Sequence, residues 1–249
     1  MKATVVLAGF HAVAARLDRA PDTLRTVYVD ERRRDGRMRD LLRLVEAAGV
    51  EIVAVDVSEL RTMAGEARHQ GVVAVADAIA QPLTLDDVLT TVDAATLLLV
   101  LDGVTDPRNL GACLRVADAA GVQAVIVPRD RSAPLTTVAS RAAAGADETV
   151  PLISVTNLAR ALDQMRDAGV RVVGAAGEVD RCLFDVDLGG PLAWVLGAEG
   201  EGMRRLTRER CDLLASIPLA GRVESLNVSV ATGICLFEAV RQRRAARRD

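Results

Sequence analysis

The stretch "TLLLVLDGVTDPRNLGACLRVADAAG", residues 96–121, decides the fold class of this chain. It opens on a continuous apolar run of the kind that a parallel sheet buries on both faces. Asp106 and Pro107 then form a typical helix start, because a carboxylate caps free N–H groups and proline fits the first turn. The stretch therefore predicts a buried strand followed by a helix over residues 107–120.

The same alternation of strands and helices continues towards the end of the chain. Further strands are predicted at "QAVIVP", "ETVPLI", "RVVGAA", "LAWVLG" and "LLASIP", with helices at 135–145, 157–168, 203–210 and 227–245. This repetition is typical of an α/β domain in which helices cover both faces of a mainly parallel sheet. We expect that architecture over residues 94–249.

A smaller α/β domain is predicted over residues 1–75. The segments "TVYVD", "EIVAVD" and "HQGVVAVAD" have strand patterns, and "GRMRDLLRLVEAAGV" between the first two has the pattern of an amphipathic helix closed by a glycine. The alternation then breaks at Pro82 and a polar run, which predicts a linker over residues 76–93.

Composition excludes several classes of protein. Half of the 249 residues are hydrophobic, which argues against a disordered chain. One tryptophan, one tyrosine and three phenylalanines are too few to build a platform on which single-stranded bases stack. The four cysteines lack metal-site spacing and there are two histidines, so we expect no metal. No segment reaches the length of a membrane span, and we expect a soluble, cytoplasmic protein.

Charge leaves the partner open. The formal net charge is -3, yet arginines cluster at 32–39, 204–210 and 241–248. Such clusters are usually solvated faces, although arginine also grips phosphate in a bidentate manner. The same two readings apply to Arg108 and Arg115, which share one face of the helix at 107–120.

Three loops that follow strands are candidates for a ligand site, since ligands of parallel sheets bind beyond the carboxyl ends of the strands. They are "LDGVTDPRNLGACLR", "VLGAEGEGMRR" and "IPLAGRVESLNVS". In the second loop Glu199 and Glu201 would repel a polyphosphate, which favours a neutral or cationic ligand. The third loop and the helix after it carry more polar groups than one cap requires, so we expect a ligand to share them; they are Ser225, Asn227, Ser229 and Thr232.

A family resemblance adds to this interpretation. "DGVTDPRNLGACLRVADAAG", "LGAEGEGMRRLTRE" and "IPLAGRVESLNVSVATGICLFEAVRQR" resemble, in order, the three signature motifs of the SpoU/TrmH class of RNA ribose 2′-O-methyltransferases, in the SPOUT superfamily. The first part of the chain resembles the L30e/L7Ae-like substrate-binding domain of that class. The resemblance implies a trefoil knot in the C-terminal SPOUT domain, S-adenosylmethionine as methyl donor, and a homodimer that binds neither DNA nor membrane.

Within the class, the chain most resembles the bacterial enzymes that methylate a guanosine ribose in the peptidyl-transferase P loop of 23S rRNA. The alternative is a target in tRNA or at another rRNA position. An RNA-binding protein without transferase activity is a second alternative, and a NAD-dependent oxidoreductase is a third. The acidic second loop and the absence of a glycine fingerprint argue against the oxidoreductase.

The motifs also imply individual roles. Contacts to S-adenosylmethionine fall at Gly197, Ile217, Leu219 and Leu226, and the catalytic group is Asn109, Arg115, Glu199, Ser225 and Asn227. We expect the Arg115 guanidinium, which stays protonated at neutral pH, to grip the phosphate beside the target ribose. In this hypothesis Glu199 and Asn109 orient Arg115. Arg222-Val223-Glu224 departs from the small polar residues common in relatives, which is expected to alter the approach of RNA.

Overall fold

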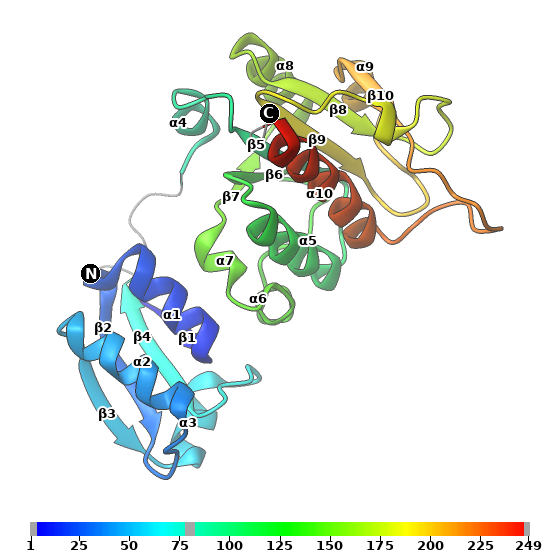
Figure 1. Ribbon diagram of the computed structural model, residues 1–249. Helices are drawn as coiled ribbons and strands as arrows, with labels where there is room; N and C mark the ends of the chain where they lie inside the picture. The colour runs from blue at the N-terminus through cyan, green and yellow to red at the C-terminus, as the bar shows by residue number, and fades with distance from the viewer. Residues whose placement is uncertain (1–3, 78–82, 247–249) are drawn as a thin grey trace. The chain divides into compact units, whose positions relative to one another are not determined.

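The computed structural model describes residues 4–77 and 83–246 (Figure 1). The chain divides into two compact units, residues 1–82 with 144–149, and residues 83–143 with 150–249. The predicted linker, 76–93, falls partly on residues 78–82, which lie outside the described residues. On either side of them, β4 (Val72–Asp77) ends and α4 (Leu85–Leu89) begins after a capping box at Thr84.

The first unit is built on a four-stranded mixed sheet. Its elements are β1 (Thr4–Ala8), α1 (Phe10–Arg19), a 3-10 turn (Pro21–Thr23), β2 (Leu24–Asp30), α2 (Gly36–Ala47), β3 (Glu51–Val55), α3 (Val57–Ala64) and β4. The strand order is β1-β4-β2-β3, with β2 and β3 parallel and the other pairs antiparallel. The predicted strands β2, β3 and β4 and the helix α2 are confirmed. Strand β1 and helices α1 and α3 had not been predicted.

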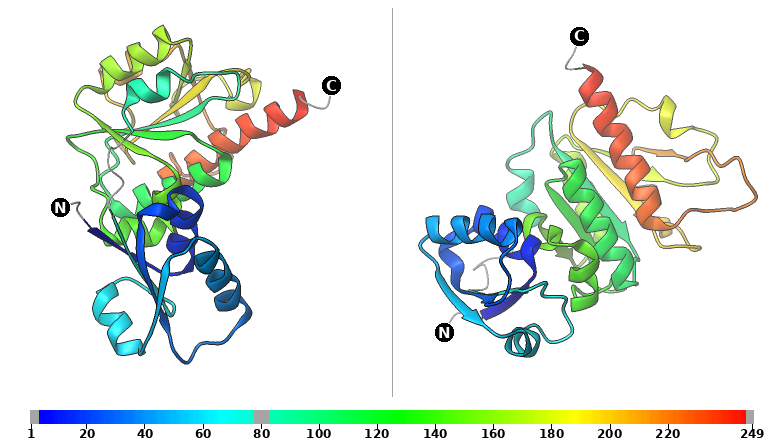
Figure 2. Two further views of the ribbon diagram at one scale, coloured as in Figure 1. Left: turned by 90° about the vertical axis from the view of Figure 1, so that its left-hand side faces the viewer. Right: turned by 60° about the horizontal axis from the view of Figure 1, so that its bottom comes forward.

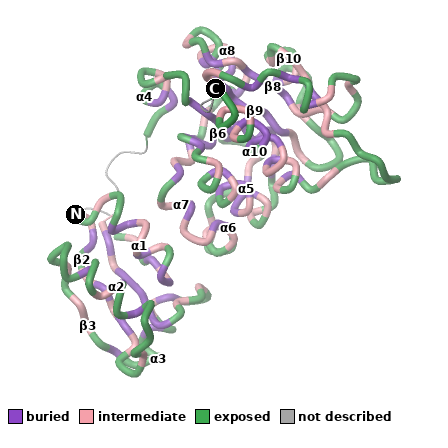
Figure 3. Tube along the Cα trace, viewed as in Figure 1, coloured by how far each residue is buried: buried purple, intermediate pink, exposed green. Residues whose placement is uncertain are grey.

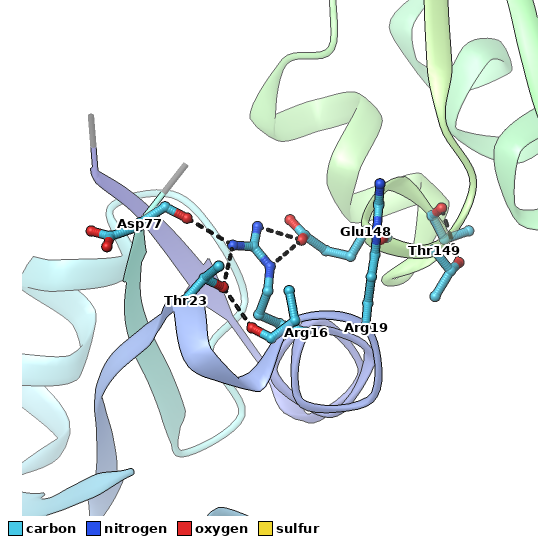
Figure 4. Close-up of polar contacts among 8 residues, drawn as sticks. Arg16, Arg19, Thr23, Asp77, Glu148 and Thr149 are labelled. Carbon is cyan, nitrogen blue, oxygen red and sulfur yellow. Dashed lines mark hydrogen bonds and ion pairs between the residues drawn. The ribbon is translucent and has the colours of Figure 1, made fainter. Parts of the chain in front are cut away.

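The segment 144–149 belongs to the first unit, and a largely buried ion pair joins it to α1 (Figure 4). Arg16 is 4% exposed, and its guanidinium donates to Glu148 Oε2 over 2.6 and 2.8 Å and to the Asp77 carbonyl over 2.9 Å. The strand predicted at "ETVPLI" is therefore partly wrong, because α7 (Ala146–Thr149) contains its first two residues. Strand β7 (Leu152–Val155) begins only after Pro151, which has no N–H to donate.

The second unit contains a six-stranded parallel sheet in the order β10-β8-β9-β5-β6-β7. Besides α4 and β7, its elements are β5 (Leu97–Asp102), α5 (Pro107–Ala120), β6 (Ala124–Pro128), α6 (Thr137–Ala143), α8 (Leu158–Asp167), β8 (Arg171–Ala175), a 3-10 turn (Leu183–Asp185), β9 (Leu192–Gly197), α9 (Arg205–Glu209), β10 (Leu213–Ala215) and α10 (Val228–Ala246). The predicted α/β architecture is confirmed. Strand β10 ends at Ala215, earlier than predicted.

Both faces of this sheet are covered, as the strand sequences require. Leu98 and Val100 of β5 pack into a core that includes residues of α4 and α8. Helices α5 and α10 lie side by side in the same unit (Figures 1 and 2). The burial map accordingly shows the central strands as buried (Figure 3). Gly111 permits close packing of α5 on α6, since an added Cβ would lie 2.1 Å from the Ala139 carbonyl oxygen.

Two features of the fold stay predictions: the trefoil knot and the boundaries of the domains. No helix within residues 4–77 and 83–246 has the length and apolar character needed to cross a membrane.

Candidate active site

The candidate site lies at the carboxyl ends of β5 and β9, the two central strands. Asp102, the last residue of β5, pairs in register with Gly197, the last of β9. From β5 the chain proceeds outward through β6 and β7, whereas β8 and β10 lie on the other side, beyond β9. This reversal of direction is the switch point at which open parallel sheets usually bind ligands. The first and second candidate loops both begin there.

Three of the five predicted catalytic residues meet at this point. Glu199, in the loop after β9, accepts hydrogen bonds at Oε1 from Asn109 Nδ2 over 3.1 Å and from Asn227 Nδ2 over 2.6 Å. The same amide of Asn227 lies 3.0 Å from Asn109 Oδ1. The backbone N–H of Val228, at the start of α10, also donates to Glu199 Oε1, over 3.2 Å. The carboxylate is therefore held in place by two other segments of the chain, α5 and the start of α10.

The first turn of α10 uses much of the polar cluster that the sequence places there. Asn227 Oδ1 accepts from the Ser229 N–H over 2.9 Å and from the Ser229 hydroxyl over 2.6 Å. The Thr232 hydroxyl donates to the Val228 carbonyl over 2.8 Å. Hydrogen bonding of the helix thus accounts for Ser229 and Thr232, which we had expected a ligand to share. Ser225 is exposed and makes no hydrogen bond to the residues that the structure describes.

Arg115 contacts neither of its expected partners, Asn109 and Glu199, within the described residues. Its side chain is exposed on α5 and makes no hydrogen bond or ion pair within the described part of the chain. Position 115 lies six residues after Asn109, which is about 9 Å along a helix axis and beyond easy reach. Asn109 and Glu199 contact each other instead. The guanidinium is consequently available to an external anion.

The Cys113 thiol interacts electrostatically with Glu199 and is buried. Burial raises the pKa of Cys113 to about 11, although a contact with the Thr232 hydroxyl at 3.5 Å acts in the other direction. A neutral thiol at physiological pH excludes thiolate catalysis at this position. Within residues 4–77 and 83–246, no group of three histidine, cysteine or acidic side chains could hold a metal ion.

The predicted contacts to S-adenosylmethionine lie on two loops of different character. At Gly197 an added Cβ would approach within 2.0 Å of the Gly202 carbonyl carbon, so the chain returns directly onto this residue. Ile217 and Leu226 are half-buried and Leu219 is 38% exposed. The backbone of residues 217–226 makes no backbone hydrogen bond within the described residues. Free backbone groups beside apolar side chains fit an adenosine, and the neighbouring carboxylate of Glu199 fits a sulfonium cation.

Comparison with protein families is consistent with this geometry. The family described as "SpoU rRNA Methylase family" matches residues 96–237, and the one described as "RNA 2'-O ribose methyltransferase substrate binding" matches residues 6–82.

The chain belongs to the SpoU rRNA methylase family.

Individual relatives of this SpoU-family chain cover nearly its whole length. It is 58% identical to a 23S rRNA (guanosine-2'-O-)-methyltransferase RlmB of Ralstonia nicotianae, over 98% of each chain. It is 53% identical to the RlmB of Bordetella pertussis, over 98% of this chain and 99% of the relative. The crystal structure of the SpoU methyltransferase AviRb from Streptomyces viridochromogenes in complex with AdoMet matches with a TM-score of 0.77 at 28% identity, over 97% and 91% of the two chains. The predicted family, fold class and methyltransferase class are confirmed.

One residue of the SpoU-family site was missed in the sequence. Asp102 is 1% exposed and is bonded to Arg204, at the far end of the loop that carries Glu199. The sequence feature that could have indicated Asp102 is its position at the end of an otherwise apolar strand, "TLLLVLD". A carboxylate buried at such a position requires a partner.

Proposed function

We propose that this SpoU-family enzyme transfers a methyl group from S-adenosylmethionine to the ribose 2′-hydroxyl of a guanosine in 23S rRNA, in the peptidyl-transferase P loop. The cluster of Asn109, Glu199 and Asn227 at the switch point carries the proposal, because it holds a carboxylate beside the two loops suited to the methyl donor. Relatives named for guanosine 2′-O-methylation of 23S rRNA are 53–58% identical to the chain, which supports the substrate.

The methyl donor is S-adenosylmethionine, whose sulfonium supplies an electrophilic methyl carbon. Structures titled as AdoMet-bound, from Streptomyces viridochromogenes and Sinorhizobium meliloti, match with TM-scores of 0.77 and 0.76. In this chain Gly197, Ile217, Leu219 and Leu226 would contact the donor, mainly through their backbone groups. With the donor bound, the apolar side chains of this set would exclude water from the reacting centre.

Glu199 has one oxygen free for the substrate. Its three hydrogen bonds from the protein all reach Oε1, and Oε2 has no partner among the described residues. In our proposal Oε2 accepts the hydrogen bond of the 2′-hydroxyl and orients it towards the methyl carbon, which assists loss of its proton. Asn109 and Asn227 keep the carboxylate from turning away. Ser225 is exposed and lies two residues before Asn227 in the sequence. In our proposal it positions the third loop against the substrate.

Arg115 binds the phosphate next to the target ribose in this scheme. Its guanidinium has no partner among the described residues, and a bidentate fork suits a phosphate better than an ammonium does. Arg115→Lys is expected to lower turnover at least about tenfold, since a point charge cannot reproduce the fork. Single-turnover kinetics with saturating rRNA measure this step. Near-normal turnover of the lysine variant with unchanged rRNA affinity would contradict the role.

A homodimer is part of the proposal. Val230 is 51% and Phe237 45% exposed, and with the half-buried Ile234 they occupy one stripe of α10 at spacings of four and three residues. A second copy of the chain would cover this stripe. Sedimentation equilibrium is expected to give twice the chain mass of 26.4 kDa, and a concentration-independent monomer would contradict the dimer.

The choice of 23S rRNA over tRNA also draws on the first unit, residues 6–82 of which match a family described as substrate-binding. Two solved structures with tRNA in their titles match only 65% and 60% of this chain. An rRNA substrate would place the enzyme in the cytoplasm.

The test is methyl transfer from labelled S-adenosylmethionine to 23S rRNA, 16S rRNA and unmodified tRNA, offered in parallel. Alkaline hydrolysis then maps any methylated ribose, because a 2′-O-methyl group blocks cleavage at that nucleotide. We expect label at one guanosine of the P loop in 23S rRNA. Label in tRNA or at another rRNA position would retain the chemistry and overturn the substrate. Absence of transfer to every RNA, with S-adenosylmethionine unbound, would overturn the function.

A further inference from the structure

Asp102 is a buried carboxylate that the chemistry described so far does not use. It ends β5, its side chain is fully shielded from solvent, and both of its oxygens are occupied. Oδ2 accepts from the backbone N–H of Arg204 over 2.9 Å, and Oδ1 accepts from Arg204 Nε over 2.6 Å. Burial of a charge is costly unless its partners are well placed, and replacing such a pair by apolar residues is often neutral or favourable to stability. Stability alone is therefore a weak reason for this pair.

The pair closes the loop that carries Glu199. This loop, residues 198–203, leaves β9 at Gly197, whose register partner is Asp102 itself. Ala198 and Gly202 exchange backbone hydrogen bonds of 3.2 and 2.9 Å, which narrows the loop to a tight hairpin. Its last turn lies against Gly197, where the Met203 nitrogen would be 2.2 Å from an added Cβ. Arg204 then binds Asp102, so both ends of the loop are attached to the same pair of strand ends.

We propose that Asp102 is a positioning residue for methyl transfer: through Arg204 it fixes the 198–203 loop so that the Glu199 carboxylate reaches Asn109, Asn227 and the Val228 N–H. The inference rests on the proposed function, because Glu199 is there the group that orients the 2′-hydroxyl. Asp102 itself is shielded from solvent and acts only through the loop.

Asp102→Asn is the central variant. The asparagine side chain has one acceptor oxygen, and its NH₂ group would face one of the two Arg204 N–H donors. One of the two hydrogen bonds to Arg204 is therefore lost. A displacement of Glu199 by about 1 Å is expected to lower kcat about 10- to 100-fold, with little change in the KM for S-adenosylmethionine. Arg205→Ala is the matched control, because the neighbouring Arg205 is exposed and, among the residues that the structure describes, pairs only with Glu209.

A double-mutant cycle with Glu199→Ala separates positioning from general destabilisation. Once the Glu199 side chain is absent, Asp102 has nothing to position, so Asp102→Asn should lower the kcat of the Glu199→Ala enzyme less than about twofold. Additive losses in the cycle, or an unchanged kcat for the single variant, would overturn the inference. If Asp102→Asn fails to fold, Arg204→Ala takes its place in the cycle, since the 43% exposed side chain of Arg204 can be removed while its backbone N–H bond remains.

A readout without RNA keeps the inference distinct from the proposed function. Hydrogen exchange of the Val228 amide reports the contact with Glu199 directly, and Asp102→Asn should accelerate it whatever RNA is methylated. Unchanged exchange at Val228 would contradict the positioning role. A wild-type enzyme that leaves 23S rRNA unlabelled would contradict only the proposed function.

Discussion

The 198–203 loop and the 217–226 loop follow two strands of one sheet, β9 and β10, which have β8 between them, yet the protein holds the two loops very differently. The 198–203 loop is closed by its own backbone hydrogen bonds and attached to the buried Asp102. The 217–226 loop makes no backbone hydrogen bond within the described residues, is largely exposed, and extends away from the sheet (Figures 1 and 3). Under the proposed function this difference would be a division of labour. Glu199, which would orient the substrate, is held in place before binding, while the 217–226 loop would form its contacts only when the methyl donor binds.

The largest effect is expected where the arranged loop meets the substrate. Glu199→Ala removes the acceptor of three hydrogen bonds and should lower kcat at least about 100-fold. The exposed Glu199 contributes little to the core, so the melting temperature should change little. Steady-state kinetics and thermal denaturation measure the two quantities.

Glu201→Gln is the control for that variant, because Glu201 lies on the same loop, is exposed and makes no hydrogen bond within the described residues. Equal loss of activity in the Glu201 and Glu199 variants would show that loop charge, not the geometry of one carboxylate, is what matters.

A smaller effect is expected on stability from glycine substitutions, which test the two loops by the same chemical change. Gly197→Ala would place a Cβ 2.0 Å from the Gly202 carbonyl carbon, and this overpacking should lower the free energy of unfolding by about 1–3 kcal/mol. In the 217–226 loop, the Cβ added by Gly221→Ala would lie within 4 Å of no other atom. This variant should change the free energy of unfolding by less than about 0.5 kcal/mol. Urea denaturation of both variants makes the measurement. Similar losses would remove the contrast between the loops.

The smallest effect is expected in the hydrogen exchange of backbone amides in the two loops. Amides of residues 217–226 are expected to exchange almost without protection in the free enzyme and to slow on addition of S-adenosylmethionine. The amides of Ala198 and Gly202 are hydrogen-bonded already and should change little. Hydrogen exchange with and without S-adenosylmethionine makes this comparison. Strong protection of the amides of residues 217–226 in the free enzyme would contradict the proposed difference between the two loops.

Local chemistry made much of the fold predictable. Helix α5 begins at Pro107 and ends at Ala120 as expected, because the Asp106 carboxylate accepts a hydrogen bond from the Arg108 N–H and Gly121 adopts a positive φ of 74°. The first strand and helix were missed. The segment "VVLAGFHAVAARL" alternates too briefly to show a strand, and the helix begins directly after Gly9, which has no side chain to cap it. Glu148 was assigned to a strand because its partner, Arg16, lies 132 residues away.

The residues of the site could be named from the motifs, but their contacts could not. Asn109, Glu199 and Asn227 were expected together with Arg115 as one group, and the structure joins only the first three. Positions 109 and 115 are about 9 Å apart along the helix axis, and no hydrogen bond joins Arg115 to Asn109 or Glu199 within the described residues, so the expected orientation of Arg115 stays a prediction.

The sequence by itself determined most of the order of strands and helices from β5 to α10 and the identity of the three loops, because apolar periodicity, caps and glycines act within a few residues. Only the tertiary structure decided that β5 and β9 lie adjacent, that Glu199 is bound by groups 90 and 28 residues away, and that Asp102 holds its loop from 102 residues away. The physical reason is that such contacts depend on which strands pair in the sheet, and strand pairing is decided by burial of the whole core.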